Sequence, residues 1–317
     1  MDRNLALELV RVTEAAALSS ARWMGKGDGV RADKAASEAM ALVINYVKIK
    51  GTIVIGEKHP NTPLTEGKIV GAGEPPEVDV GLDPLESIDS VALGRQNAIS
   101  IIAVGEKGAF FSTPVPYMNK IAVGPDAAGR INIKQTPLEN LVNIADGKRT
   151  YVENLTVCIL ERDRHQELIG EVRDTGARIQ LIPDGDIAAA IATCIPGSGI
   201  DVLMGVGGAN EGVLAAAAVK CAGGDFQGQV YIRNDEDTTA LKQSGFGRRD
   251  KILKIDDLVK GDNTMFAATG VTKCDFLNGV RFVQGGAVTH SLVVRSKSGT
   301  ERFIRTNHYF EKQPDYA

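Results

Sequence analysis

The chain has few cysteines, few aromatic residues and no long apolar segment. Its four cysteines are far apart among 317 residues and form neither a CxxC pair nor a zinc-binding pattern. No segment approaches the roughly 20 apolar residues that a membrane-spanning helix needs. The N-terminus carries acidic residues early and lacks the apolar core of a signal peptide. We therefore expect buried free thiols, a cytoplasmic location and no membrane partner.

The sequence also lacks a strong excess of charge of either sign. Lys and Arg number 36 against 40 Asp and Glu, which gives a formal net charge of -4. The basic cluster at 248–251 is short and typical of a solvated face. A nucleic-acid partner is therefore not expected. The hydrophobic content of 43% is that of an ordinary globular protein, and 317 residues are enough for two domains.

Apolar periodicity and turn residues indicate the order of helices and strands. The spacing predicts helices over 4–24 and 32–47, strands over 51–56 and 78–82, and a hairpin over 98–112 that turns at 106–108. From about residue 150, strands alternate with helices, which favours an α/β fold with parallel pairing. The strands of this half are predicted over 155–160, 177–182 and 201–206. We place a domain boundary between residues 148 and 149.

Acidic side chains recur where predicted strands end. Loops at strand ends of α/β sheets converge on one crevice, so these carboxylates are candidates for one site. Converging carboxylates repel each other unless a cation lies between them, and oxygen ligands suit Mg²⁺ or Mn²⁺. The residues concerned are Glu57, Asp83, Glu86, Asp184, Asp186 and Glu211.

Each of these carboxylates also has a simpler interpretation. Asp and Glu after a strand commonly cap helices or stabilise turns. Asp186 fits a helix cap, and Glu211 could complement a helix dipole. Whether the carboxylates meet in space is left open by the sequence.

Two further motifs favour phosphate binding without requiring it. GVGGANEG (205–212) has Asn210 where a dinucleotide fingerprint has its third glycine, and no Walker lysine is present. Its glycines would let backbone N–H groups approach a phosphate, or would serve tight packing. Arg162 and Arg164 follow a strand, as phosphate ligands or as alternating helix charges. His165, beside them, is interpreted as a packing or surface residue, and no nucleophile elbow is found.

Eight motifs, in order along nearly the whole chain, resemble the class II fructose-1,6-bisphosphatase family of the GlpX type. They are RVTEAAAL (11–18), GTIVIGE (51–57), VDVGLDPLE (78–86), PYMNK (116–120), PDGD (183–186), GVGGANEGV (205–213), FAATGVT (266–272) and AVTHSLVVRS (287–296). The resemblance implies a layered α/β/α/β/α sandwich of the sugar-phosphatase type. It also implies hydrolysis of the 1-phosphate of fructose 1,6-bisphosphate with Mn²⁺ or Mg²⁺, in a homodimer or homotetramer.

The resemblance assigns site residues to both predicted domains, a metal-binding domain over 1–148 and a sugar-phosphate-binding domain over 149–317. The implied metal ligands are Asp33, Glu57, Asp83, Glu86 and Glu211. The implied substrate contacts are Glu86, Ser87, Ile88, Tyr117, Arg162, Asp163, Arg164, Asp184, Gly185, Asp186 and Gly208. The partner is then a small sugar phosphate.

The sequence departs from the family in two catalytic loops. After GTIVIGE the family usually continues Gly-Glu-x-Asp-Glu-Ala-Pro-Met, whereas His59 and Asn61 replace two acidic residues here. After DPLE the family usually has Gly-Thr, and this chain has Ser87 and Ile88. The family's threonine hydroxyl is implied to orient and deprotonate water, and isoleucine has no donor or acceptor.

The catalytic residues are then expected to be Glu57, Asp83, Glu86, His59 and Asn61. Loss of one general-base function typically lowers a rate by about 10²–10⁴. Three interpretations stay open: a bisphosphatase with weakened activity, a catalytically silent paralogue that binds metal and sugar phosphate, and a phosphatase for another substrate such as sedoheptulose 1,7-bisphosphate.

Overall fold

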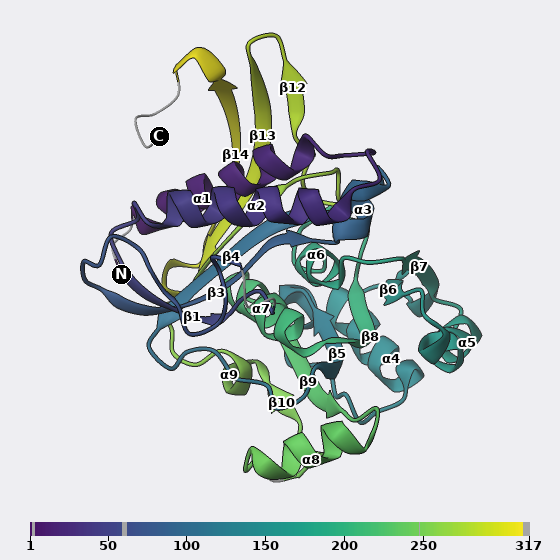
Figure 1. Ribbon diagram of the computed structural model, residues 1–317. Coiled ribbons are helices and arrows are strands. Elements are labelled where there is room, and N and C mark those ends of the chain that lie inside the picture. Colours follow the sequence, from purple (N-terminus) through teal and green to yellow (C-terminus); the bar gives the residue numbers. More distant parts are fainter. Residues whose placement is uncertain (2–3, 59–61, 247, 313–317) are drawn as a thin grey trace. The chain divides into compact units, whose positions relative to one another are not determined.

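The chain forms two compact units in a computed structural model that describes residues 1, 4–58, 62–246 and 248–312 (Figure 1). One unit joins Met1–Ala109 with Gly261–Ala317, and the other is Phe110–Lys260. Each unit contains its own mixed sheet. The units divide after Ala109 and Lys260, and the domain boundary predicted between residues 148 and 149 stays a prediction.

The discontinuous first unit is built on an eight-stranded sheet of order β12-β13-β11-β4-β3-β1-β2, with β14 paired to β13. β1 and β3 are parallel, and the other described pairs are antiparallel. The strands are β1 (Lys50–Ile55), β2 (Ile69–Val70), β3 (Glu77–Glu86), β4 (Ile99–Glu106), β11 (Met265–Gly270), β12 (Arg281–Val283), β13 (Gly286–Arg295) and β14 (Thr300–Tyr309).

Two long helices lie side by side on this sheet, α1 (Leu5–Ala21) and α2 (Gly29–Ile44) (Figure 1). Their apolar residues recur at helical spacing, so Leu9 and Met40 are fully buried in one cluster with strand residues such as Ile53. A short helix, α3 (Ile88–Ala92), follows β3 directly. These elements fix the positions of the acidic residues of this unit.

The second unit is a six-stranded sheet of order β10-β9-β5-β8-β6-β7 with helices on two faces. One face carries α4 and α5, and α7 packs against the other, where Gly212 approaches Met118 and Lys120. Its strands are β5 (Tyr117–Val123), β6 (Thr156–Leu160), β7 (Arg178–Ile182), β8 (Val202–Gly208), β9 (Asp225–Tyr231) and β10 (Leu253–Lys254). Its helices are α4 (Pro137–Lys148), α5 (Gln166–Asp174), α6 (Asp186–Ala192), α7 (Ala209–Cys221), α8 (Asp235–Gln243) and α9 (Ile255–Leu258).

The predicted α/β class is confirmed, as is the parallel pairing of β6 with β7 and β8. The four cysteines are free and buried, as expected. The hairpin predicted over 98–112 is wrong, because β4 pairs with β3 and β11, and Phe110 forms an isolated bridge with Val259. Strand β3 also continues beyond the predicted 78–82, so Asp83 and Glu86 belong to the strand itself. Among the described residues, no helix is long and apolar enough to cross a bilayer.

Candidate active site

In the first unit, two predicted metal ligands, Asp33 and Glu57, lie close together. Asp33 is half-buried on α2, and Glu57 follows β1, where its N–H donates to Leu64 O at 3.1 Å. The Ser37 hydroxyl, one helical turn after Asp33, donates to Glu57 Oε2 at 2.5 Å. Burial, together with the nearby charge of Glu57, raises the pKa of Asp33 to about 6. A divalent cation at this pair would stabilise the charged carboxylates.

The other two predicted ligands of this unit, Asp83 and Glu86, lie at the end of β3. The register of β3 against β4 shifts between them, and Asp83 Oδ1 accepts a hydrogen bond from Leu85 N–H at 3.1 Å. Glu86 is buried, with 5% of its surface exposed. The irregular strand end thus holds one half-buried and one buried carboxylate.

Neither of the two residues after Glu86, Ser87 and Ile88, takes the place of the family's catalytic threonine hydroxyl in an obvious way. Ser87 has left-handed backbone angles (φ 68°, ψ 55°), and its buried hydroxyl has no hydrogen-bond partner in the described part of the chain. Ile88 is the first residue of α3, is 37% exposed, and packs over Gly29, where a Cβ would lie 2.7 Å from its Cγ2. His59 and Asn61 lie outside the described residues.

In the second unit, the predicted substrate residues Tyr117 and Arg164 are in contact. Tyr117 is the first residue of β5, and Arg164 Cζ lies 5.5 Å from the centroid of its ring. Arg164 also donates to Val206 O through Nε (3.2 Å) and Nη2 (2.8 Å). Arg162 donates to Glu161 O at 2.9 Å, and Asp163 begins the short 3-10 helix Asp163–His165. Arg164 is therefore held in place while its remaining N–H groups are exposed.

His165, the residue after Arg164, is buried and connects the end of β6 to β8. Only 2% of its surface is exposed, and its Nδ1 lies 2.7 Å from Leu160 O. Its Nε2 accepts a hydrogen bond from Val206 N–H at 2.8 Å, so Nδ1–H is the donor to Leu160. Burial, helped by Arg164, lowers the pKa of His165. The imidazole is therefore a neutral packing group, in agreement with the interpretation from sequence.

Asp186 is held by a lysine within the sheet. Lys120, in the middle of β5, is 2% exposed, forms an ion pair with Asp186 and donates to Gly208 O at 3.0 Å. Asp186 therefore does not cap α6, whose N-cap is Gly185 in a left-handed conformation. Asp184 Oδ1 accepts from Gly185 N–H at 3.0 Å in the same turn. The structure thus brings Asp186 and Gly208, distant in sequence, to one ammonium group.

The glycines of GVGGANEG make room for these side chains. A Cβ at Gly207 would overlap Asp186 Oδ2 and lie 2.7 Å from Lys120 Nζ. A Cβ at Gly208 would overlap the carboxylate of Glu211. Glu211 lies in the first turn of α7, and its buried Oε2 has no hydrogen-bond partner among the described residues. The packing interpretation of these glycines is supported, and Glu211 is left with an acceptor that a cation would satisfy.

Comparisons with known proteins assign this chain to a family. The family model described as "Bacterial fructose-1,6-bisphosphatase, glpX-encoded" matches residues 3–308. The chain belongs to this class II fructose-1,6-bisphosphatase family. Relatives named fructose-1,6-bisphosphatase 1 class 2, from Escherichia coli, and fructose-1,6-bisphosphatase class 2, from Shigella flexneri, are each 41% identical over 327 residues. Each alignment covers 99% of this chain and 97% of the relative. The resemblance found in the sequence motifs is confirmed.

Class II fructose-1,6-bisphosphatases depend on a divalent metal ion, and the carboxylates of this chain fit one in chemical type. The raised pKa of Asp33 and the orphaned Oε2 of Glu211 are the observations that favour a cation. Among the described residues, no group of three or more His, Cys, Asp and Glu side chains is arranged to hold an ion. The assignment of all five metal ligands therefore stays a prediction.

Sequence reasoning missed two residues of this family member that contact predicted substrate residues. Lys120 binds Asp186, and Arg233 lies beside Tyr117, with its Cζ 4.8 Å from the ring centroid. A signal for Lys120 was present, because a lysine inside the apolar strand YMNKIAV has to find a buried partner. The sequence gives no such signal for Arg233. An arginine shortly after a strand is common on protein surfaces.

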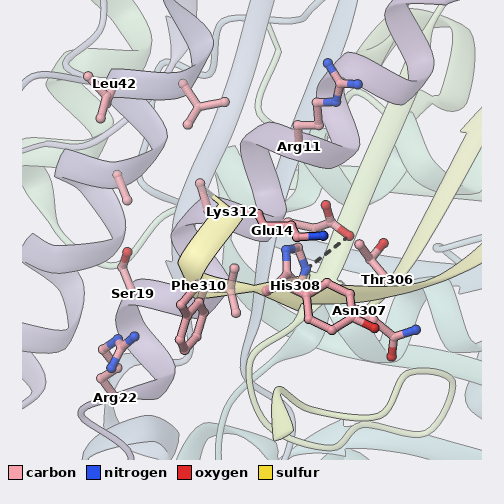
Figure 2. A pocket seen from close by; sticks show the side chains of 15 residues that line it. Arg11, Glu14, Ser19, Arg22, Leu42, Thr306, Asn307, His308, Phe310 and Lys312 are labelled. Carbon is pink, nitrogen blue, oxygen red and sulfur yellow. Dashed lines mark ion pairs between the residues drawn. The ribbon is translucent and has the colours of Figure 1, made fainter. Parts of the chain in front are cut away.

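A separate cavity of about 720 Å³ lies between α1, α2 and the C-terminal strand β14 (Figure 2). Figure 2 shows Glu14 and His308, two of its lining residues, joined by a dashed line, and Glu14 Oε1 lies 3.9 Å from His308 Nε2. Its lining includes Arg11, Arg22 and Lys312, and none of the predicted site residues. This cavity is therefore distinct from the carboxylates of the candidate site.

Proposed function

We propose that the protein hydrolyses the 1-phosphate of fructose 1,6-bisphosphate, with Mn²⁺ or Mg²⁺, to give fructose 6-phosphate and inorganic phosphate. The observation that carries the proposal is the close pair Asp33 and Glu57, in which burial and mutual repulsion raise the pKa of Asp33 to about 6. It occurs in a chain that aligns with class II fructose-1,6-bisphosphatases over 99% of its length.

The carboxylates are proposed to hold the metal. A bound divalent ion would polarise the phosphate and lower the pKa of the attacking water. The proposed ligands are Asp33, Glu57, Asp83, Glu86 and Glu211.

The second unit is proposed to hold the sugar phosphate. Arg164, fixed on Val206 O, offers its remaining N–H groups to phosphate oxygens, which guanidinium groups bind well. Asp186, held by Lys120, is proposed to accept hydrogen bonds from sugar hydroxyls. The remaining proposed contacts, carried over from the family resemblance, are Glu86, Ser87, Ile88, Tyr117, Arg162, Asp163, Asp184, Gly185 and Gly208.

Water activation is proposed to differ from that of the family. Ile88 offers no hydroxyl, and Asn61 cannot act as a base. His59, whose ordinary pKa is about 6.5, is the proposed general base near neutral pH. A rate below that of relatives with threonine at this position is expected.

Phosphate release from fructose 1,6-bisphosphate, measured with and without Mn²⁺ or Mg²⁺, tests the proposal. The wild type should release phosphate only with metal, and Asp83→Ala should lower the rate by at least about 10², because a metal ligand is lost. Glu77→Gln is the matched control, because Glu77 lies on the same strand but is exposed and paired with Lys50. Its rate should equal that of the wild type.

Two results would overturn the proposal. One is an absence of release at every metal concentration while calorimetry shows that the metal binds. The other is an Asp83→Ala variant as active as the wild type.

The proposal extends to assembly and location. We place the protein in the cytoplasm, a reducing compartment that suits four buried free cysteines. A homodimer or homotetramer is proposed from the family resemblance, and light scattering of the purified protein measures it.

A further inference from the structure

Strand β14 lies at the edge of the eight-stranded sheet. It pairs with β13 over ten consecutive residues without a register shift. β11 and β12 pair with β13 on its other side, and Figure 1 shows β12 and β14 on opposite sides of β13. In the described part of the chain, the outer edge of β14 therefore has no strand that accepts or donates its ladder hydrogen bonds.

This edge lacks the features that commonly keep an edge strand from pairing with another chain. Such features are proline, lysine, a bulge or a very short strand. The segment TERFIRTNHY (300–309) contains neither proline nor lysine, and its pairing with β13 is long and regular. Two aromatic side chains are also exposed on it, Phe303 at 51% and Tyr309 at 66%. A regular edge with exposed aromatic rings is suited to the addition of a further strand.

Glu301, Phe303 and Arg305 lie on one face of β14. Successive side chains of a strand point to opposite faces. Ile304 packs against the core cluster of this unit and His308 lines the cavity beside α1 and α2, so the even-numbered side chains face the helices. The odd-numbered residues occupy the other face, and all three are exposed.

The charges of this face are self-complementary in one register. When two identical strands pair antiparallel about a twofold axis, residues equidistant from the axis lie opposite each other on the same face. An axis at Phe303 places Glu301 of each copy opposite Arg305 of the other copy, with the two aromatic rings between the ion pairs. An axis at Arg302 or at Arg305 places like charges opposite each other instead.

Glu301 is partly removed from water without a compensating cation. Burial raises the pKa of its carboxyl group, and no positive charge of the described residues offsets this effect. Its neighbour across the ladder, on β13, is the apolar Val294. A cation supplied by a second copy would stabilise the charged carboxylate.

We propose that β14 is the surface through which two copies of this chain associate, edge to edge and antiparallel about Phe303. The eight-stranded sheets of the two copies then form one continuous sheet. The inference rests on the homo-oligomer of the proposed function, for which it names the interface, and it does not depend on the hydrolysis.

The test reverses the two charges separately, with Glu301→Arg in one variant and Arg305→Glu in another. The wild type should associate, and the Kd of each variant should rise about 10- to 100-fold, because two ion pairs become two repulsive pairs. Sedimentation velocity at one protein concentration should then give each variant half the molar mass of the wild-type assembly. An equimolar mixture of the two variants should recover the wild-type mass, because each copy meets opposite charges on the other.

Arg302→Glu is the matched control. It makes the same change in charge on the same strand, but Arg302 belongs to the face that carries Ile304 and donates to Thr300 Oγ1 at 3.0 Å. In the proposed register it lies opposite Ile304 of the other copy, so no ion pair is lost. The mass of the assembly should equal that of the wild type.

Three results overturn the inference. A monomeric wild type removes the homo-oligomer and its proposed interface together. A wild type that associates, with single variants that associate equally well, removes the interface alone. If both variants fold but lose association and their mixture does not recover it, β14 contacts a different surface. None of these measurements uses phosphate release, so a failure of the proposed hydrolysis is detected separately.

Discussion

The N–H of Val206 donates to Nε2 of His165, and the carbonyl of the same residue accepts two hydrogen bonds from Arg164. Arg164 and His165, on the loop after β6, therefore bind the carbonyl and the N–H of the same residue of β8. Gly205 makes the approach possible, because a Cβ there would lie 2.9 Å from His165 Nε2 and its φ of 124° is unfavourable for other residues. Arg164, the proposed phosphate ligand, and the neutral imidazole of His165 are thus held by the same residue.

We expect the stability of the protein to fall in mild acid because of His165. Burial, with the charges of Arg164 and Arg162, lowers its pKa below the ordinary value of about 6.5. As the pH falls below about 6.5, the unfolded chain takes up the proton first, so the free energy of unfolding decreases until the lower folded pKa is passed. Urea unfolding between pH 5 and pH 8 measures this.

His165→Gln should flatten that pH dependence, because glutamine does not titrate. His290→Gln is the comparison variant. It should also flatten the pH dependence, because burial and the charges of Arg305 and Arg281 lower the pKa of His290 as well. Parallel curves for wild type and His165→Gln would contradict the prediction.

Lys120→Met should destabilise the protein strongly. Removal of the ammonium leaves Asp186 buried without its partner, and breaking a buried pair costs about 3–5 kcal/mol. The double variant Lys120→Met with Asp186→Asn should recover part of this loss, because the uncompensated charge is gone. The free energy of unfolding in urea measures both effects, and equal stability of the single and double variants would argue against the pair.

Gly208→Ala should weaken metal binding, because its Cβ would overlap the Glu211 carboxylate and displace it. Calorimetry with Mn²⁺ measures the effect, for which we expect a fall in affinity of about 10-fold or more. Gly170→Ala is the control: Gly170 lies inside α5, and apart from its chain neighbours and the backbone of its own helix, no atom of the described residues lies within 4 Å of its Cβ position. That change should leave metal affinity unchanged and stabilise the fold by about 0.5–1 kcal/mol.

Ser87→Gly should stabilise the protein modestly. A non-glycine residue in the left-handed region costs about 1–2 kcal/mol, while glycine costs about 0.4–1 kcal/mol through the unfolded chain. The buried Ser87 hydroxyl also lacks a hydrogen-bond partner among the residues that the structure describes, which adds to the gain on its removal. Arg149→Gly, at an exposed left-handed position, has the backbone gain without the hydroxyl, so thermal unfolding should show the larger stabilisation for Ser87→Gly.

Restoring the family residues should raise turnover. The triple variant Asn61→Asp, Ser87→Gly and Ile88→Thr returns an acidic residue and a hydroxyl, and one general-base function is worth about 10²–10⁴ in rate. The initial rate of phosphate release at saturating metal and substrate is the measurement. Unchanged kcat in the folded triple variant would contradict this prediction and would mean that the existing base, proposed to be His59, is as effective as the family's residues.

Local sequence patterns determined most elements of this protein. The helices predicted over 4–24 and 32–47 correspond to α1 and α2, and the strands before Glu57, Arg162 and Asp184 lie where periodicity placed them. These features depend on neighbours within a few residues, so periodicity, glycine and proline suffice to locate them. The acidic residues at strand ends and the family motifs could be identified in the same way.

The tertiary structure decided which of these residues meet. The position of Asp186 before a helix also allows a helix cap, but Lys120, 66 residues away, takes its carboxylate. Likewise β4 has the pattern of a hairpin strand, yet β11 arrives from the far end of the chain to pair with it. Such contacts are selected by the burial of whole sheets and by the need to satisfy buried charge, and neither is encoded in a short stretch of sequence. The sequence therefore determined the chemical groups and their family, and the packing of distant strands decided their partners.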